Sequence, residues 1–381
     1  MSAFAFSPFT FCECKIPVSS FTSKALTTVA EVHANPTDMM VLRPQGMYCP
    51  AGDFYIDPWR PVDRAVITHA HADHARTGHA HYLAARDAEH VLRARLGAID
   101  LQTLAYAEAI TMNGVRVSLH PAGHVLGSAQ VRVEHAGQVW VASGDYKTAP
   151  DATCAPFEAV ACNTFITEST FGLPIYRWPS DAQVFADINA WWSANAALGL
   201  ASVLYCYSFG KAQRILSGVD ASIGPIVVHG AVQLLNAAYR ASGVALPETQ
   251  LVTDVTDIAS LKQALVLAPP SVAGSTWMKR FGEYRDGFAS GWMLLRGARR
   301  RRGVDRGFVL SDHADWPGLQ SAIAATGCEQ VIVTHGSVPV MVRYLEEKGL
   351  SARAFATEFG DDAADEKAND RADDAREVVQ A

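Results

Sequence analysis

Three histidines and an aspartate are crowded into one short segment, ITHAHADH, at residues 67–74. They follow the apolar run AVIT, which is typical of a buried strand, so we expect these side chains on a loop at the strand's end. His69 and His71 would point to one side of an extended chain, and Asp73 and His74 elsewhere. This spacing suits two neighbouring metal ions. Without a cation, several crowded polar atoms would each need a hydrogen-bond partner at the same time.

A dinuclear site needs further ligands, and three other strand ends offer them. His124 lies in PAGHVLGS after the apolar stretch VRVSL, and the flanking glycines permit a tight loop that presents its side chain. Asp145 follows QVWVAS, and each oxygen of its carboxylate could take one cation. His335 ends the stretch QVIVTH. Four strand ends with histidine or aspartate predict a metal centre more strongly than any one of them.

These motifs resemble those of the metallo-β-lactamase fold, an αββα sandwich, and within it the β-CASP nucleases. The resemblance extends from about Leu42 to Phe359. It implies an α/β protein in which a β-CASP α/β lobe is inserted into the sandwich. The positions similar to the family's seven motifs are, in chain order, Asp57, the segment from His69 to His74, His124, Asp145, Glu168, His313 and His335.

The resemblance also implies roles for these residues. His69, His71 and His124 would hold one zinc ion, and Asp73, His74 and His335 the other, with Asp145 shared. Manganese is the alternative metal. The nucleophile would be a metal-bound hydroxide, because bound metals lower the pKa of water.

The residues expected to serve catalysis directly are Asp73, Glu168, His313 and Asp57. His313 would protonate or hydrogen-bond the leaving oxygen or the phosphoryl group, and Glu168 would orient its imidazole. Asp57 would orient a ligand or a metal-bound water. A structural hydrogen-bonded pair is the alternative for Glu168 and His313.

Several longer segments are most similar to the bacterial ligase-associated DNA exonucleases and the mRNA 3′-end processing factor-like proteins. They are FITESTFGLPIYRW, YSFGKAQRIL, APPSVAGSTWMKRF and GFVLSDHADWPGL. This similarity implies a DNA exonuclease of repair or end processing, with an ATP-dependent DNA ligase and a helicase as partners. His335 favours RNA instead, because RNA-cleaving members have a histidine there and animal members acting on DNA often lack it. An RNA-processing ribonuclease is therefore the alternative.

Composition agrees with a two-lobed α/β protein. The 381 residues are 49% hydrophobic, and apolar strands alternate with amphipathic helices. No run is long enough to cross a bilayer, so we expect no membrane association. Seven cysteines show no zinc spacing, which favours a reducing cytoplasm. The predicted divisions are a leader at 1–40, either disordered or a mis-assigned start, the core at 41–175, an inserted β-CASP lobe at 176–302, the second part of the core at 303–359, and an acidic disordered tail at 360–381.

Two regions could bind nucleic acid. Ser208, Gly210, Lys211 and Gln213 lie at a predicted turn from strand to helix, where backbone amides and a lysine could receive a phosphate. A plain helix N-cap with a solvated lysine is the alternative. The formal net charge is −7, but the tail carries eight acidic and three basic residues. The basic run Arg299, Arg300, Arg301 and Arg302 could therefore still neutralise phosphates.

Two other classes of function stay open. The core could serve a small-molecule metallo-hydrolase, such as a lactonase or thioesterase. The chain could also be a non-catalytic subunit that binds nucleic-acid ends. The inserted lobe and the arginines favour nucleic acid over the first, and the intact set of ligand positions argues against the second.

Overall fold

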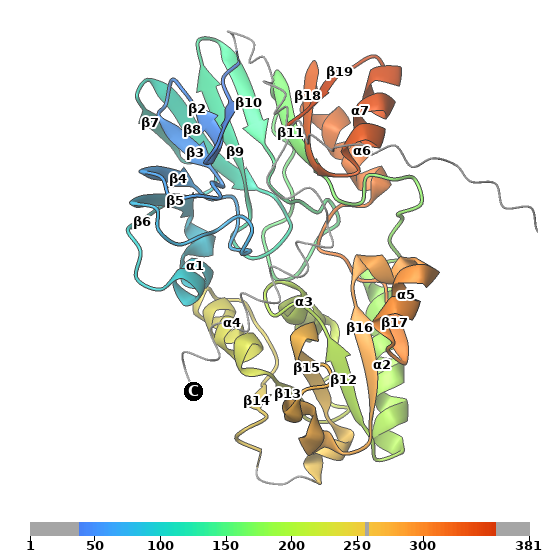
Figure 1. Ribbon diagram of the computed structural model, residues 1–381. Helices are drawn as coiled ribbons and strands as arrows, with labels where there is room; N and C mark the ends of the chain where they lie inside the picture. The colour runs from blue at the N-terminus through green and yellow to red at the C-terminus, as the bar shows by residue number, and fades with distance from the viewer. Residues whose placement is uncertain (1–37, 256–258, 356–381) are drawn as a thin grey trace, which may run out of the picture. The chain divides into compact units, whose positions relative to one another are not determined.

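The computed structural model describes residues 38–255 and 259–355, which contain three β-sheets (Figure 1). The predicted acidic tail at 360–381 and the leader up to residue 37 lie outside the described residues. The chain is therefore a mixed α/β protein, as predicted. In the described part, none of the helices has the length and apolarity needed to cross a membrane.

The first sheet has six strands in the order β1-β2-β3-β4-β5-β6. Its first three strands pair antiparallel, and the pairs from β3 to β6 are parallel. The strands are β1 (Val41–Arg43), β2 (Gly46–Cys49), β3 (Phe54–Ile56), β4 (Arg64–Val66), β5 (His81–Ala85) and β6 (Leu101–Leu104).

The second sheet has seven strands in the order β19-β18-β11-β10-β9-β8-β7. Strands β7 to β10 form an antiparallel meander, and β10, β11, β18 and β19 run parallel. The strands are β7 (Ala109–Met112), β8 (Val115–Pro121), β9 (Ala129–His135), β10 (Gln138–Ala142), β11 (Thr164–Ser169), β18 (Gln330–Gly336) and β19 (Ser351–Ala354).

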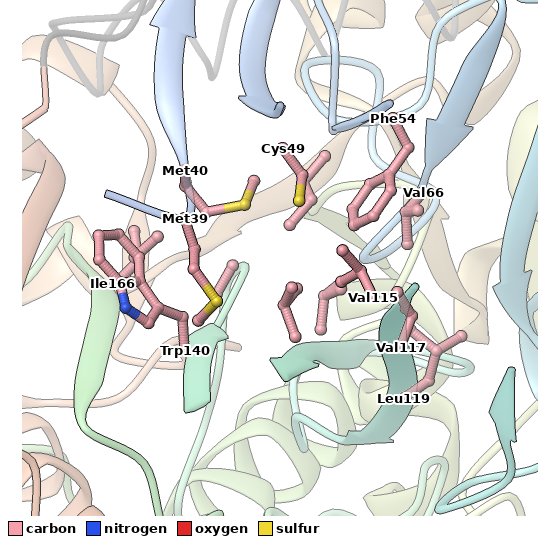
Figure 2. Close-up of a cluster of buried hydrophobic side chains, with 14 of the residues drawn as sticks. Met39, Met40, Cys49, Phe54, Val66, Val115, Val117, Leu119, Trp140 and Ile166 are labelled. Carbon is pink, nitrogen blue, oxygen red and sulfur yellow. The ribbon is translucent and has the colours of Figure 1, made fainter. Parts of the chain in front are cut away.

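The first two sheets pack face to face, and together with their helices we call them the sandwich. Alternate residues of β8, such as Val115, Val117 and Leu119, meet Phe54 and Val66 of the first sheet in one buried core (Figure 2). Helix α1 (Glu89–Leu96) covers the outer face of the first sheet. Helices α6 (Trp316–Thr326) and α7 (Val338–Glu347) cover the second. The result is a four-layered αββα arrangement.

The third sheet is entirely parallel, in the order β14-β13-β15-β12-β16-β17. We call this sheet and its helices the third-sheet lobe. Helices α2 and α3 pack on one face, and α5 and short 3-10 turns on the other. The elements are α2 (Asp181–Ala197), β12 (Ala201–Tyr205), α3 (Lys211–Gly218), β13 (Ile226–Val228), α4 (Gly230–Ala241), β14 (Gln250–Leu251), β15 (Leu265–Ala268), β16 (Tyr284–Ala289), α5 (Arg296–Arg302) and β17 (Arg306–Phe308).

Two predicted boundaries are corrected by the structure. Strand β17 pairs with β16, so the chain is still in the third sheet after residue 303, where we predicted a return to the core. The apolar stretch GFVL alone could not show which sheet it would join. Met39 and Met40 were assigned to the leader, but both are buried in the sandwich core (Figure 2).

Met40 offers a test of this packing, because its side chain is only 1% exposed between the two sheets. We expect Met40→Ala to lower the free energy of unfolding by about 2–5 kcal/mol through lost burial and a residual cavity. Urea unfolding at fixed metal content measures it. The control is Leu198→Ala, at a side chain that is 71% exposed, which should change stability by less than about 0.5 kcal/mol. Equal effects of the two substitutions would contradict this placement of Met40.

Candidate metal centre

Imidazole and carboxylate groups from four strand ends converge on Asp145. His69, His71, His124 and Asp145 form the first cluster, whose ligand atoms all lie within 4.8 Å of one another. Asp73 and His74 form a second group with the same Asp145. His335 joins it through its Nε2, which lies 3.1 Å from Asp145 Oδ1. We call Asp73, His74, His335 and Asp145 the second cluster. All seven side chains predicted as ligands are thus brought together around one carboxylate.

The hydrogen bonds of the first cluster leave its inner nitrogens without protons. His71 Nε2 donates to the Phe209 carbonyl at 3.3 Å, and His124 Nδ1 donates to the Asp312 carbonyl at 2.8 Å. A carbonyl only accepts, so the protons lie on those outer nitrogens. The inner nitrogens, His71 Nδ1 and His124 Nε2, face each other at 3.0 Å.

Burial keeps both of these imidazoles neutral. It is the largest effect on each, and it lowers the pKa of His71 well below its usual value and that of His124 as well. Two lone pairs therefore point at each other in a dry site, which is unfavourable unless a cation lies between them. This arrangement fits a metal ion and is hard to explain as packing.

His69 completes the first cluster in the same way. Thr68 Oγ1 donates to Asp57 Oδ2 at 2.5 Å, so it accepts from His69 Nδ1, which lies 3.1 Å away. His69 Nε2 is buried and makes no hydrogen bond to any described residue. It lies 3.4 Å from Asp145 Oδ2. Three unprotonated imidazole nitrogens and a carboxylate oxygen are a donor set that suits zinc.

The second cluster is held by partners within the sandwich. His74 Nδ1 donates to Asp57 Oδ2 at 2.7 Å, which turns its Nε2 toward Asp73 and Asp145, each 3.5 Å away. Thr334 Oγ1 donates to the Thr167 carbonyl and so accepts from His335 Nδ1 at 3.1 Å. Asp73 Oδ1 is buried without a hydrogen-bond partner among the described residues. The inner nitrogens of His74 and His335 and the Asp73 oxygen are thus also positioned to coordinate a cation.

The carboxylates of the second cluster favour a positive charge at its centre. Burial disfavours the imidazolium forms, but the surrounding carboxylates outweigh it. They raise the pKa of His74 well above its usual value and that of His335 to about 9. The same imidazoles overcome the effect of burial on Asp145 and hold its pKa well below the usual value. A bound metal would replace these protons as the source of positive charge.

Asp57 links the two clusters from behind. Its Oδ1 accepts from the Thr68 N–H at 2.7 Å, and its Oδ2 accepts from Thr68 Oγ1 and from His74. It thereby orients His74 directly and His69 through Thr68. The residue adopts a φ of 44°, in the left-handed region that few side chains favour. Such strain at a partly buried carboxylate that accepts three hydrogen bonds is typical of a site held in place for function.

Glu168 and His313 form a pair beside the clusters. His313 Nδ1 lies 3.0 and 2.9 Å from the two Glu168 oxygens, and the Tyr146 N–H donates to the same carboxylate at 2.9 Å. Glu168 is buried, whereas the His313 side chain is 22% exposed. Burial lowers the pKa of His313, but Glu168 and Asp145 outweigh it and raise the pKa to about 9. The imidazole can therefore carry a proton near neutral pH.

One cleft connects the clusters with the third-sheet lobe. His313 lines it together with ligand residues of both clusters. Tyr207, Lys211 and Trp292 line it from the lobe. The cleft thus places a potential proton donor and two candidate cation sites in one space, bounded by both parts of the chain.

The residues predicted to receive a phosphate at α3 have other partners. The Gly210 N–H donates to Gln213 Oε1 at 2.8 Å, as in a helix N-cap, and Ser208 is fully buried. Lys211 Nζ lies 2.8 Å from Asp312 Oδ2, and both side chains are 4% exposed. Lys211 is therefore not the solvated lysine of the alternative interpretation, but a buried partner of a carboxylate.

The predicted basic run lies on α5. Arg299, Arg300 and Arg301 are exposed, and the Arg302 guanidinium lies 4.4 Å from the centre of the Phe288 ring. Arg299 and Arg300 line a hollow that also includes two aspartates, outside the cleft of the clusters. The structure therefore brings these arginines together with one another but not with the two clusters.

Sequence reasoning missed the groups that orient the ligands. They are Thr68, Thr334, Asp312 and the Phe209 carbonyl. A signal for the two threonines was present, because each directly precedes a ligand histidine at a strand end, in ITH and in VTH. The carbonyl partners carry no signal of this kind, since every residue has a carbonyl and only the fold decides where it points.

Comparisons with known proteins complete this description. No family model matches the chain. A protein of Opitutus terrae named probable DNA ligase is 32% identical over 314 residues, which is 81% of this chain and 30% of that protein. An endoribonuclease ysh1 of Aspergillus fumigatus is 36% identical over 125 residues, 32% of this chain and 14% of that protein. The chain thus spans less than a third of the length of these curated relatives.

One solved structure extends the comparison to the fold. A protein of unknown function from Enterococcus faecalis V583 matches with a TM-score of 0.52 and 11% sequence identity. The match covers 78% of this chain and 80% of that one. At this identity the likeness concerns the fold alone.

Asp57→Asn tests the support of the second cluster. The amide nitrogen cannot accept the hydrogen bonds from Thr68 and His74, although asparagine tolerates the left-handed φ. We expect affinity for metal to fall about 10- to 100-fold, as for other residues that orient metal ligands. Competition with a chromophoric chelator measures the affinity.

A matched control is available in Asp53→Asn. Asp53 is exposed and also has a left-handed φ, of 54°, but it accepts a hydrogen bond from Tyr48 rather than from a ligand. Its substitution should leave metal affinity unchanged. If both variants bound metal as the unaltered protein does, Asp57 would have no role in orienting the ligands.

Proposed function

This chain is related to the β-CASP nucleases of the metallo-β-lactamase fold, and we propose that it is a metal-dependent phosphodiesterase acting on nucleic acid. More specifically, we propose a DNA exonuclease of repair or end processing. The observation that carries the proposal is the pair of ligand clusters sharing Asp145 next to the pair of Glu168 and His313. This combination supplies sites for cations and a group that can donate a proton.

The fold supports this assignment. The αββα arrangement corresponds to the metallo-β-lactamase sandwich, and the third-sheet lobe, placed in sequence between β11 and β18, corresponds to a β-CASP insertion. The segment between Ser311 and Asp315 leads back from the lobe and carries His313. The proposed division is therefore a core up to about residue 175, the lobe up to strand β17, and a second part of the core.

Two cations are part of the proposal, zinc with manganese as the alternative. The first cluster would hold one and the second cluster the other, with Asp145 between them. When bound, the ions would supply Lewis acidity toward phosphoryl oxygens and a nucleophile at neutral pH. Asp57, Thr68 and Thr334 keep the ligand imidazoles in the tautomers that leave their inner nitrogens free.

His313 and Glu168 have the geometry of a proton donor and its orienting carboxylate. Glu168 fixes Nδ1 as the protonated nitrogen on its own side, so Nε2 is the atom that can donate to an oxygen of the substrate. The Trp178 side chain donates to the His313 carbonyl at 2.9 Å and holds the backbone of this segment. We propose that His313 donates its proton to the leaving oxygen as the phosphodiester is cleaved.

The choice of DNA over RNA as substrate is the more specific part of the proposal. A relative that matches 81% of this chain is named a probable DNA ligase, which supports DNA as substrate and a DNA ligase as partner. A helicase is a further candidate from the family resemblance. Shorter matches include proteins named endoribonucleases, so RNA is the alternative. Arg299, Arg300 and Arg301, exposed on α5, are candidates for phosphate contacts outside the cleft. A cytoplasmic location stays a prediction.

Degradation of matched DNA and RNA tests the assignment. End-labelled single strands of identical sequence are incubated with the purified full chain and zinc or manganese. We expect stepwise shortening of DNA, loss of activity in chelator and recovery on adding metal back. The control is Asp73→Ala, which lacks one ligand of the second cluster and should be inactive. Digestion of RNA alone would overturn the DNA assignment, and no digestion of either polymer would overturn the nuclease assignment.

The pH dependence of kcat tests His313. Its raised pKa, about 9, keeps the proton on the imidazole at neutral pH, so activity should fall as pH rises toward 9. Cations bound nearby would move this alkaline limb to lower pH by repelling the imidazolium. We expect His313→Ala to lower kcat by about 10²- to 10⁴-fold, as for loss of a general acid.

Glu168→Gln distinguishes the role of Glu168 from that of His313. Without the carboxylate, the pKa of His313 should fall, so the alkaline limb should shift to lower pH while activity at acidic pH is largely kept. His90→Ala, at an exposed histidine of α1, is the control and should leave the profile unchanged. An alkaline limb at the same pH in Glu168→Gln would show that His313 is not the group that titrates.

A further inference from the structure

The two clusters are oriented by different parts of the chain. The second cluster is held by Asp57 and Thr334, which both belong to the sandwich. In the first cluster, Thr68 of the sandwich orients His69, whereas His71 and His124 are oriented by the carbonyls of Phe209 and Asp312. Phe209 precedes α3 in the third-sheet lobe, and Asp312 lies on the segment that leads back from it. The first cluster therefore depends on where the lobe lies, and the second does not.

The contact at Phe209 is direct. Its carbonyl accepts from His71 Nε2, and its ring lies 4.9 Å from the His71 ring, between centroids. Gly210, next in the chain, comes so close to the sandwich that a Cβ there would lie 2.3 Å from Val125 Cγ1. Its φ of 83° also favours glycine. This glycine lets the chain approach the loop that carries His124.

Helix α3 acts on His124 indirectly, through buried charge at Asp312. The Asp312 side chain meets Lys211 Nζ at 2.8 Å and Arg214 Nη1 at 3.3 Å. Arg214 Nη2 also donates to both oxygens of Asp181 of α2, at 2.5 and 2.6 Å, and Arg214 Nε lies 3.2 Å from Asp151 Oδ2 of the sandwich. The Lys211, Arg214, Asp151 and Asp312 side chains are all less than 5% exposed.

A buried carboxylate with two cationic partners has little freedom to move. Each charge would be costly in a dry environment without its partner, so the positions of Lys211 and Arg214 fix the position of Asp312. The backbone of Asp312 is fixed with its side chain, and its carbonyl then fixes the ring of His124. Lys211 forms its ion pair with Asp312 and is joined to His124 by this chain of bonds.

We propose that Lys211 and Arg214 are positioning residues for the first cluster, so that the affinity of this cluster for its ion depends on the docking of α3 against the sandwich. The proposal rests on the proposed function, because it takes the clusters as metal sites. It differs from a direct role of Lys211 in binding phosphate, in which metal affinity would not depend on this lysine.

The coupling must act in both directions. If docking of α3 strengthens binding at the first cluster, an ion at that cluster must strengthen the docking of α3 by the same factor. An ion at the second cluster has no such effect, since its orienting groups lie within the sandwich. Occupancy of the first cluster by metal would then increase the stability of the docked position of α3.

The test uses two full-length backgrounds that each keep one cluster. Asp73→Ala with His335→Ala keeps the ligands of the first cluster, and His71→Ala with His124→Ala keeps those of the second. Lys211→Met is added to each, and affinity for Zn²⁺ is measured by competition with a chelator. Lys211→Arg tests rescue by a conserved charge. Lys262→Met, at an exposed lysine of the same lobe, is the matched control.

We expect Lys211→Met to weaken zinc binding about 10- to 100-fold in the background with the first cluster and by less than about twofold in the other. Lys211→Arg should recover most of the affinity, and Lys262→Met should leave both backgrounds unchanged. Equal weakening in both backgrounds, or none in either, would overturn the proposal. Absence of zinc binding in the unsubstituted chain would instead overturn the proposed function.

Hydrogen exchange gives a second measurement that does not require Lys211→Met to fold well. Backbone amides of α3 should exchange more slowly when zinc is added to the background that keeps the first cluster. They should be unaffected in the background that keeps the second. Protection of α3 by zinc in both backgrounds, or in neither, would contradict the coupling even if every Lys211 variant were unstable.

Discussion

The buried carboxylate of Asp145 is the group on which the site depends. One oxygen lies 3.1 Å from His335, and the other lies 3.4 to 3.8 Å from His69, His74 and His124. A carboxylate in such a place is costly unless positive charge compensates it. Imidazoles alone can compensate it only by taking up protons, which burial opposes at His69. Cations satisfy the carboxylate and the imidazoles together, which explains why so many ligands meet there.

The orienting groups around the ligands share one chemical property. The Phe209 and Asp312 carbonyls and the Asp57 carboxylate can only accept hydrogen bonds, and the two threonine hydroxyls are made acceptors by the bonds that they donate. In its neutral form, each imidazole therefore carries its proton on the outer nitrogen and leaves the inner one for a metal. The inner nitrogens need no rearrangement before they bind a metal. The fold, and not the ion, therefore sets the orientation of the ligand imidazoles.

The sequence allowed the convergence of these side chains and the α/β class to be predicted, because both depend on local patterns. Apolar runs marked the strands, and histidine or aspartate at their ends marked the ligands. The resemblance to the β-CASP nucleases rested on those motifs, and the relatives confirm it. The αββα arrangement was expected from that resemblance and not from the local patterns themselves. The edge strand β17 was misassigned because pairing partners are not encoded in a three-residue strand. The burial of Lys211 was missed because its partner, Asp312, is a hundred residues away in sequence.

The buried charges between the lobe and the sandwich explain an apparent contradiction in the composition. A protein with a net charge of −7 is a poor electrostatic partner for nucleic acid as a whole. Near the clusters, however, Lys211 and Arg214 form ion pairs with Asp312, Asp151 and Asp181. Their positive charge is therefore neutralised within the protein. Under the proposed function, attraction of phosphate at the cleft would then come from bound cations and from His313. Filling the metal sites would strengthen binding of a polyanion there, which would tie recognition of the substrate to the same ions that serve the chemistry.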